Sequence, residues 1–435
     1  MAQPSKTRTS IGGFGGRGWF IIIYCGLMFW FFVGMVNDGQ NFTAPAFAAK
    51  TGIDYPLVLS MSTIAGIVGV ILFILFGQIN RKLGAVKAST LSLVIGGLAY
   101  IMVGQVNTLA SYAVVLCVLG GSMMSAGYIS GGILVANWFP KKRGIVMGYT
   151  TMGHNLASAF YVPLIALLVG GYGLTRGVML PGILTIILGV IGLIFVKNTP
   201  QERGVFPDNV DEATYRKEYF TDNLDEDGGW TTKALLKNKQ LWLSATSTGI
   251  IQLITTGIMT QLVVRNVSLG FEEGQAVAMM TVLALIGVVG SWAFGVIDQK
   301  LGTKKSMYIF VAWEIIALAA NVSETQFGIY LSVVMIGAAI GGSANFTVSL
   351  PANVFGRHGF SKVNSVVFPI QGFFTSIAFV INAIALSLFG TLRAAYVIFI
   401  ILIAFDLLLI RQVKEGAYNR DFQAEEKLVE ETTES

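Results

Sequence analysis

The stretch GQINRKLGAVK at residues 77–87 returns as GVIDQKLGTKK at residues 295–305. Gly, Ile, Lys, Leu, Gly and Lys recur in register at six of the eleven positions, at an offset of 218 in a chain of 435 residues. Each copy separates two long apolar runs. A second pair, NWFPKKRG at 137–144 and NVFGRHG at 353–359, repeats at an offset of 216. Two matched pairs at nearly one offset indicate that the chain is an internal duplication.

The composition predicts a protein that crosses a membrane many times. Hydrophobic residues make up 54% of the chain and charged residues only 12%, about half of the roughly 25% found in soluble domains. Runs of about 20 apolar residues are long enough to cross the hydrocarbon. Twelve such runs are expected, at 19–42, 57–79, 87–107, 110–137, 145–169, 175–196, 241–264, 275–297, 305–322, 326–350, 362–389 and 392–411. We therefore expect an all-α membrane protein with twelve transmembrane helices in two pseudo-symmetric six-helix halves.

The polar segments divide the chain and orient it. We expect a tail at 1–18, a first half at 19–197, a central loop at 198–240, a second half at 241–411 and a tail at 412–435. The loops on the side of the repeated phrases hold eleven basic residues: Arg81, Lys82, Lys87, Lys141, Lys142, Arg143, Lys300, Lys304, Lys305, Arg357 and Lys362. The other side offers four, Lys50, Arg176, Arg265 and Arg393. The positive-inside bias then predicts a multi-pass cell-membrane protein with both termini cytoplasmic.

Three phrases resemble a known family. The stretch 77–87 is similar to the loop between spans 2 and 3 of the major facilitator superfamily, although Arg81 stands where an acid is usual and Asp298 comes one place early in the second copy. WFPKKRGIVMGYTTMG at 138–153 and TPQERGVFPDN at 199–209 resemble the oxalate–formate antiporter and monocarboxylate-transporter group. The resemblance implies transport by halves that rock about a midplane site. The glycine phrases are expected to gate the cytoplasmic side through Gly77, Arg81, Gly84, Gly295, Asp298 and Gly302.

The resemblance also implies which spans line a cavity. In this superfamily the first and fourth helices of each half line it, and the second and fifth lie at its sides. Buried polar groups in a membrane are costly and usually face a cavity or a partner. The candidate substrate-binding residues on those spans are Asn37, Asp38, Gln40, Tyr128, His154, Asn155, Gln252, Asn345 and Gln371, with Thr256 and Asn382 in similar positions. For each uncharged residue, hydrogen bonding between helices and contact with a ligand remain open.

Two residues are candidates for coupling to protons. His154 is one of only two histidines in the chain, and an imidazole titrates near neutral pH. Asp38 lies on a cavity-lining span, where desolvation would favour its uncharged form; the alternative is a solvated position at the outer rim. Two further carboxylates lie in peripheral spans. Asp406 is expected to reach the inner interface from its place near Arg411, whereas Glu314 is deeper and has no evident partner.

The absence of basic residues bears on the substrate. Oxalate-type members carry a basic residue in span 8 and another in span 11, but residues 275–297 and 363–389 contain neither Lys nor Arg. Arg176, Arg265 and Arg393 lie near the expected outer mouth, where they could steer an anion. The favoured interpretation is a secondary transporter of a small organic monocarboxylate, by proton symport or anion exchange. A proton-coupled carrier of a neutral, zwitterionic or aromatic solute is the alternative.

Other classes of function find less support in the sequence. A membrane sensor would need an output domain, and the 24 residues after Arg411 are too few for one. No G-x-x-x-x-G-K-[ST] phrase occurs to bind a nucleotide. We therefore expect no enzyme activity, no cofactor, no metal and no nucleic-acid partner, and the expected partners are a solute, a proton or counter-anion, and the lipid bilayer.

Overall fold

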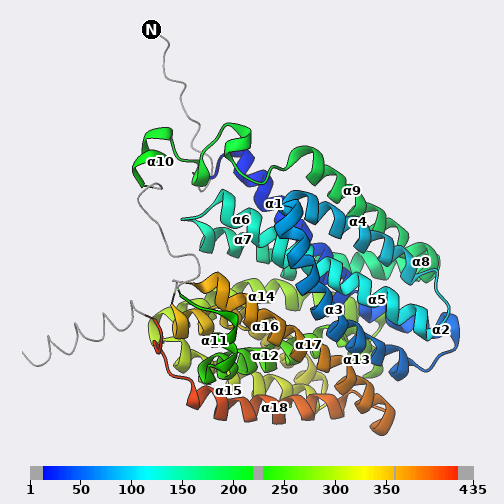
Figure 1. Cartoon of the computed structure of the whole chain (residues 1–435). Coiled ribbons are helices and arrows are strands. Elements are labelled where there is room, and N and C mark those ends of the chain that lie inside the picture. Colours follow the sequence, from blue (N-terminus) through cyan, green and yellow to red (C-terminus); the bar gives the residue numbers. More distant parts are fainter. Residues whose placement is uncertain (1–12, 219–228, 357–358, 420–435) are drawn as a thin grey trace, which may run out of the picture.

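Long apolar helices build the structure, because a backbone inside hydrocarbon must satisfy its own hydrogen bonds. The computed structural model describes residues 13–218, 229–356 and 359–419. In these ranges, eleven helices are long and apolar enough to cross a membrane, and a further apolar helix, Met179–Phe195, has 17 residues. The predicted all-α membrane fold is therefore confirmed, and the sixth of its spans is the short one (Figure 1).

The N-terminal half is the upper layer in Figure 1, coloured blue to green. Its helices are α1 (Gly15–Phe32), η2 (Val33–Asp38), α2 (Gln40–Thr51), α3 (Tyr55–Leu83), α4 (Ala85–Val103), α5 (Leu109–Met124), η3 (Ser125–Gly131), α6 (Gly132–Trp138), α7 (Arg143–Leu156), η4 (Ala157–Tyr161), α8 (Val162–Gly177) and α9 (Met179–Phe195). Three short helices follow: η5 (Gln201–Arg203), η6 (Pro207–Asn209) and α10 (Glu212–Glu218).

The C-terminal half is the lower layer, coloured green to red (Figure 1). Its helices are α11 (Thr232–Lys237), α12 (Lys239–Met259), α13 (Leu262–Ser268), α14 (Glu273–Leu301), α15 (Thr303–Val322), α16 (Gln326–Phe355), α17 (Phe360–Phe389) and α18 (Arg393–Gln412). The short helix α11 lies within the stretch 230–239 that closes the central loop.

Local sequence fixes where several helices begin. The first backbone N–H groups of a helix need acceptors. The Thr108 hydroxyl accepts from Ser111 N at the start of α5, and Asn238 accepts from Gln240 N at the start of α12. Polar capping residues of this kind therefore mark the ends of helices that are otherwise almost uniformly apolar.

The repeated glycine phrases have the same backbone shape. Gly84 (φ 80°, ψ 159°) separates α3 from α4, and Gly302 (φ 81°, ψ 156°) separates α14 from α15. A positive φ favours glycine because it has no Cβ. After each glycine, a side chain from beyond the sixth span of that half caps the next helix. Asn198 Oδ1 accepts from Val86 N at 3.0 Å, and Glu415 Oε1 accepts from Lys304 N at 3.0 Å. The sequence repeat is thus also a structural repeat.

The two ends of the bundle differ in the contacts between the halves. We call the end with residue 13, α10, α11 and residues 413–419 the terminal face, and the opposite end the distal face; they lie at the left and right of Figure 1. In the described residues, the side-chain hydrogen bonds that join the halves come from Asn41, Tyr55 and Thr281. All three lie at the distal face or between it and mid-depth, so the halves are bonded together on the distal side.

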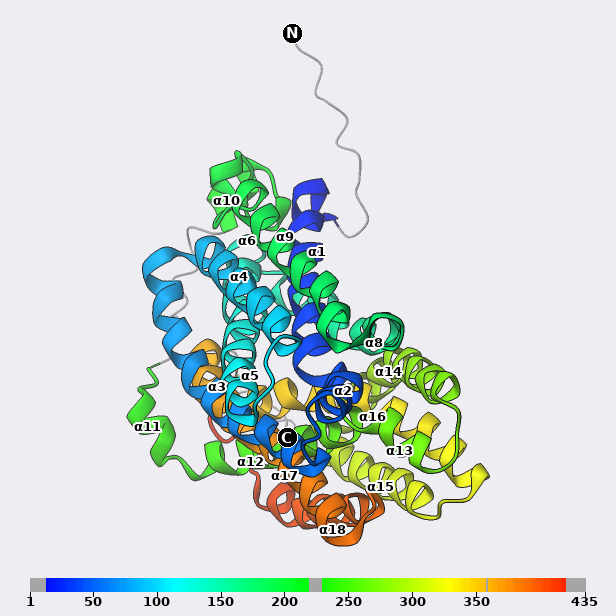
Figure 2. The same cartoon turned by 90° about the vertical axis from the view of Figure 1, so that its right-hand side faces the viewer.

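Two helix pairs form most of the remaining contact between the halves. Helix α3 packs along α17, and α14 packs against α7, η4 and α8. Figure 2, turned by 90°, shows α3 toward one side of the molecule, α17 near its lower middle, and α8 and α14 toward the other side.

Candidate functional site

Three central helices of the N-terminal half contain π-helical turns. The turns are η2, which ends at Asp38, η3, which contains Tyr128, and η4, which follows His154. They interrupt spans that are otherwise α-helical, and η2 packs against η4. Such turns occur frequently at functional sites because they change the direction in which side chains point. In the described residues of the C-terminal half, no helix contains a π turn.

An aromatic cluster lies beside these turns, at the contact between the halves. The Tyr128 ring lies edge-on to Phe29 at 5.2 Å, to Phe32 at 5.5 Å and to His154 at 6.1 Å between ring centroids. From the other half, the Phe368 ring lies 5.6 Å from that of Tyr128. Phe29 and Phe32 are buried, whereas Tyr128, His154 and Phe368 are half-buried. We call these five residues the central aromatic cluster.

His154 has an unused polar atom in this cluster. Its Nε2 is buried and has no hydrogen-bond partner among the described residues. Its ring packs on Phe29 with centroids 4.9 Å apart. Buried polar atoms are nearly always hydrogen-bonded, so an exception calls for an explanation. A bound solute or proton carrier that contacts this nitrogen would supply the missing partner.

Asp38 is buried rather than solvated at the outer rim. Its residue is 2% exposed, and its Oδ2 accepts a hydrogen bond from Ser158 Oγ at 2.5 Å. Among the described residues no ion pair to Asp38 is formed. Ser158 lies four positions after His154, so Asp38 contacts the same stretch of α7 and η4 that contains His154. Ser158 was not among the predicted site residues, because a lone serine in an apolar span is common.

Several candidate residues serve to join helices. Gln40 is buried, donates to Val36 O at 2.6 Å and accepts from Ser62 Oγ at 2.7 Å. Gln371 is buried and donates to Thr248 Oγ1 at 2.8 Å. These contacts favour the structural alternative for both glutamines.

Two candidate asparagines of the C-terminal half also join helices through hydrogen bonds. Asn345 is half-buried, and its amide bonds Ser291 through both its oxygen, at 3.1 Å, and its nitrogen, at 2.7 Å. Asn382 is buried and donates to Gly257 O at 2.8 Å. Thr256, another candidate of this half, is buried in α12, next to the Gly257 that Asn382 contacts.

Three candidate side-chain amides form no hydrogen bonds between helices among the described residues. Asn37, Asn155 and Gln252 are half-buried, and none has a side-chain hydrogen bond to a described residue. Asn155 lies close to the other half, since a methyl group added to Gly287 would be 3.8 Å from its Oδ1. Among the described residues, these amides, His154 Nε2 and the unpaired Oδ1 of Asn382 have hydrogen-bonding capacity to spare.

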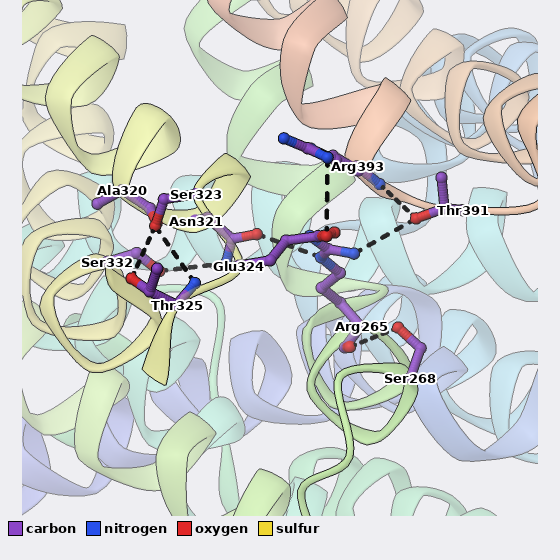
Figure 3. A network of polar contacts seen from close by, with 10 residues as sticks. All are labelled: Arg265, Ser268, Ala320, Asn321, Ser323, Glu324, Thr325, Ser332, Thr391 and Arg393. Atoms are coloured by element: carbon purple, nitrogen blue, oxygen red, sulfur yellow. Dashed lines mark hydrogen bonds and ion pairs between the residues drawn. The ribbon is translucent and has the colours of Figure 1, made fainter. Parts of the chain in front are cut away.

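Arg265 does not lie at an open mouth, so the expectation that it steers a solute is wrong. It is 1% exposed and donates to Asn321 Oδ1 at 3.2 Å, to Thr391 Oγ1 at 3.4 Å and to Glu324 Oε1 at 2.7 Å (Figure 3). Arg393 is half-exposed and lies 3.8 Å from the other Glu324 oxygen. The guanidinium thus joins the distal ends of α13, α15 and α18 within one half.

The two peripheral carboxylates also differ from one another. Asp406 does not reach the interface as expected, because it is fully buried and accepts from Ser247 Oγ at 3.0 Å. Glu314 is buried, as predicted from its depth, and its Oε2 has no partner among the described residues.

The residues of the two predicted gating loops all lie at the terminal face, in different halves. Gly77 and Gly295 are within α3 and α14, near their terminal-face ends, and Arg81 is exposed. Asp298 is half-buried, and its Oδ1 has no partner among the described residues. Whether these residues gate transport stays a prediction.

Comparison with known proteins gives a family match over most of the chain. A sequence model of the Major Facilitator Superfamily matches residues 26–368. The oxalate:formate antiporter of Oxalobacter formigenes is 25% identical over 228 residues, which are 50% of this chain and 50% of that protein. The glycerol-3-phosphate transporter of Bacillus subtilis (strain 168) is 26% identical over 152 residues, 33% of this chain and 34% of that protein. The chain therefore spans half or less of the length of these curated relatives.

The fold has similar solved structures. The crystal structure of a D-xylose–proton symporter matches with a TM-score of 0.69 over 92% of this chain and 98% of that chain. Only 12% of the aligned residues are identical. The similarity at this identity concerns the arrangement of the helices.

Proposed function

Because the chain belongs to the Major Facilitator Superfamily and is a secondary transporter of that type, we propose that it moves a small organic monocarboxylate across the cell membrane by alternating access. The coupled species is a proton, in symport, or a second anion, in exchange. The terminal face, with both termini, is cytoplasmic in this proposal, as the basic loops indicate. The distal side then faces the outside, and among the described residues the side-chain bonds between the halves lie on that side.

The observation that carries this proposal is the unpaired Nε2 of His154 in the central aromatic cluster. A carboxylate needs hydrogen-bond donors, and an imidazole nitrogen can provide one. The edges of aromatic rings carry positive partial charge and favour an anion at the rim of the cluster. The half-buried amide of Asn155, one residue further, adds a second donor within reach of the same region.

The charge of the site supports one carboxylate group rather than two. In α14 and α17 the basic residues are Lys300 and Lys362, both near the terminal-face ends of their helices. A dianion at mid-depth would thus lack a cation from these helices, and unpaired charges in a membrane are costly. The name of the similar oxalate:formate antiporter includes formate, a monocarboxylate. Oxalate itself is a poor candidate for this chain.

We assign proton coupling to Asp38, with His154 as a second candidate. A carboxyl that is buried without a counter-charge is expensive to ionise, so a proton is its natural partner. The Ser158 hydroxyl at 2.5 Å stabilises the ionised form enough for the proton to be released. A group with this balance can take up a proton when one face is open and release it when the other is.

An alternative substrate class rests on the same cluster. The Phe368 ring lies across the junction of the halves from Tyr128, at 5.6 Å. A flat neutral or zwitterionic ring could stack there instead of a carboxylate, and Asp38 would then drive uptake alone. The two proposals differ in whether the solute must carry a negative charge.

Counterflow in proteoliposomes tests this choice. Vesicles with the purified protein are loaded with unlabelled lactate, and entry of labelled lactate is measured against formate, pyruvate, oxalate, lactamide and phenylalanine as competitors. Competition by the monocarboxylates and none by lactamide or oxalate is the expected result. Competition by lactamide or phenylalanine alone would overturn the monocarboxylate assignment. His154→Gln should weaken lactate binding, whereas Tyr149→Phe on the same helix, an exposed position toward the terminal face, should not.

A further inference from the structure

The seventh span is broken near the distal face. Helix α12 ends at Met259 and α13 begins at Leu262, with Gln261 in a non-helical conformation (φ −128°, ψ 6°). A break of this kind leaves a carbonyl at the end of one helix and an N–H at the start of the next without their helical partners. Both groups then need other partners, because they are buried.

One side chain from the other half fills the break. Asn41 Nδ2 donates to Met259 O at 2.7 Å, and Val263 N donates to Asn41 Oδ1 at 2.9 Å. In an uninterrupted helix Val263 N would donate to Met259 O, four residues earlier. The Asn41 amide is therefore inserted into the hydrogen-bond ladder of the seventh span, in place of one peptide-to-peptide bond. Asn41 is 3% exposed, so no water competes for these bonds.

The position of this contact is set by the duplication. Met259 lies 218 positions after Asn41, the offset of the repeated glycine phrases. The two residues therefore occupy equivalent places in the two halves, and a contact between equivalent places lies on the pseudo-twofold axis that relates them. A solute that crosses the protein along this axis must pass the Asn41–Met259 contact. The same Asn41 nitrogen also donates to Asp38 O at 2.8 Å, which ties the contact to the proposed proton site.

We propose that Asn41 is a positioning residue that holds the two halves together at the distal face. We also propose that the seventh span has two states, one broken and one continuous. In the distal-closed state the span is broken and Asn41 occupies the break. When the halves part on the distal side, Asn41 withdraws and Val263 N–H bonds Met259 O, so that α12 and α13 join into one helix. One of the two hydrogen bonds lost between the halves is thereby replaced by a bond within the helix, and this exchange narrows the energy difference between the two states.

Two substitutions should shift the equilibrium between the distal-open and distal-closed states in opposite directions. Asn41→Ala removes the inserted amide but leaves the helical bond available, so it favours the distal-open state. Val263→Pro removes the N–H that donates to Asn41 Oδ1 in the distal-closed state and would donate to Met259 O in the distal-open state, so it costs one hydrogen bond in each state. The proline ring itself is tolerated in the distal-closed state, because residue 263 is in the first turn of α13. A continuous helix would place that proline in its interior, so this variant favours the distal-closed state. Tyr55→Phe is the matched control, because it removes another bond between the halves, Tyr55 Oη to Gln261 Oε1 at 2.7 Å, without touching the ladder.

The measurement is the distance across the distal face in full-length protein. Spin labels are placed at Asp54→Cys and Glu273→Cys, exposed positions in opposite halves, in a background without the native cysteines. Asn41→Ala should enlarge the long-distance population about tenfold, as expected for two lost hydrogen bonds of ordinary strength. Val263→Pro should leave only the short distance and stop lactate exchange. The Tyr55 control should give a smaller shift than Asn41→Ala.

Unchanged distances in Asn41→Ala, or opening in Val263→Pro, would overturn the proposal. If the proline variant does not fold, Asn41→Leu replaces it: this change keeps the approximate size of the side chain but loses both the donor to Met259 O and the acceptor for Val263 N–H, and a shift at least as large as that of Asn41→Ala is expected. A distance distribution in Asn41→Leu equal to that of wild type would contradict the insertion. The distance measurements do not depend on the identity of the solute, so their failure is distinguishable from failure of the monocarboxylate proposal.

Discussion

The contact between α3 and α17 leaves no room for a methyl group at Gly66. A Cβ added there would lie 2.7 Å from the Ser376 Cβ and 3.3 Å from the Ser376 Cα. Non-bonded carbon atoms prefer separations of about 3.5–4.0 Å. Rotation of the serine side chain moves only its hydroxyl, so the clash with its Cβ persists. Gly66→Ala must therefore push the two halves apart in the distal half of the membrane.

The size of the effect follows from the cost of overpacking. Extra methyl groups in a well-packed site cost about 1–3 kcal/mol, and a factor of ten in an equilibrium constant corresponds to about 1.4 kcal/mol. Gly66→Ala should thus disfavour the distal-closed state by about 5-fold to 150-fold, because the penalty disappears where the helices separate. Ser376→Gly removes the close Cβ and hydroxyl and leaves the 3.3 Å contact with its Cα. The double variant should recover most of the lost population.

The assay is the same distance measurement across the distal face, arranged as a double-mutant cycle. Residues in direct contact show coupling energies of about 0.5–3 kcal/mol, whereas distant residues are additive. We expect strong coupling between Gly66→Ala and Ser376→Gly, with each variant checked for an intact thermal transition. Gly274→Ala, at an open glycine where nothing lies within 4 Å of the added methyl, is the control. An unchanged distance distribution in folded Gly66→Ala, or additive effects in the cycle, would contradict the predicted clash with Ser376.

Three further changes test other parts of the molecule. Asp38→Asn should abolish accumulation driven by a pH gradient while counterflow stays measurable; accumulation like that of wild type would remove Asp38 from coupling. Glu324→Gln should lower stability by about 2 kcal/mol, since it takes a charged hydrogen bond from buried Arg265, whereas half-exposed Arg393→Gln should change the melting temperature little; equal melting shifts would contradict this ranking. Gly84→Val should slow transport more than it weakens binding, because φ is 80° there and the solute binds elsewhere; a loss of affinity at unchanged rate would assign the loop another role.

The architecture could be predicted from the sequence because it depends on local and repeated features. Twenty-residue apolar runs have few alternatives to a spanning helix in hydrocarbon. The phrases around Gly84 and Gly302 contain the same turn residues, and they adopt φ values within one degree of each other. Their caps from Asn198 and Glu415 were not predicted, since these residues follow the sixth span of each half and share no recognisable pattern.

The site was less predictable because a sequence gives the depth of a residue but not the direction of its side chain. Gln40 and Asp38 differ by only two positions, yet one joins helices and the other faces Ser158. The π turns add a residue to a helical turn, so the phase of an ideal helix no longer indicates the direction of a side chain beyond them. Arg265 was misplaced for a related reason. Its depth is near the distal end, but the loop after α15 brings Glu324 over it and makes a charged residue part of the interior.

The two halves share a fold but not a chemistry, and alternating access explains why that suits a transporter. At the offset of 218 the counterpart of Asp38 is Thr256, and that of Asn41 is Met259. The N-terminal half therefore carries the proposed proton site and the inserted amide, while the C-terminal half offers a broken helix whose backbone receives that amide. A symmetric pair of amides on the axis would compete for one space, whereas a side chain and a backbone gap are complementary. Because Asn41 also bonds the carbonyl of Asp38, the proposed proton site and the proposed closure of the distal face share one helix turn, and we expect a change at either to affect the other.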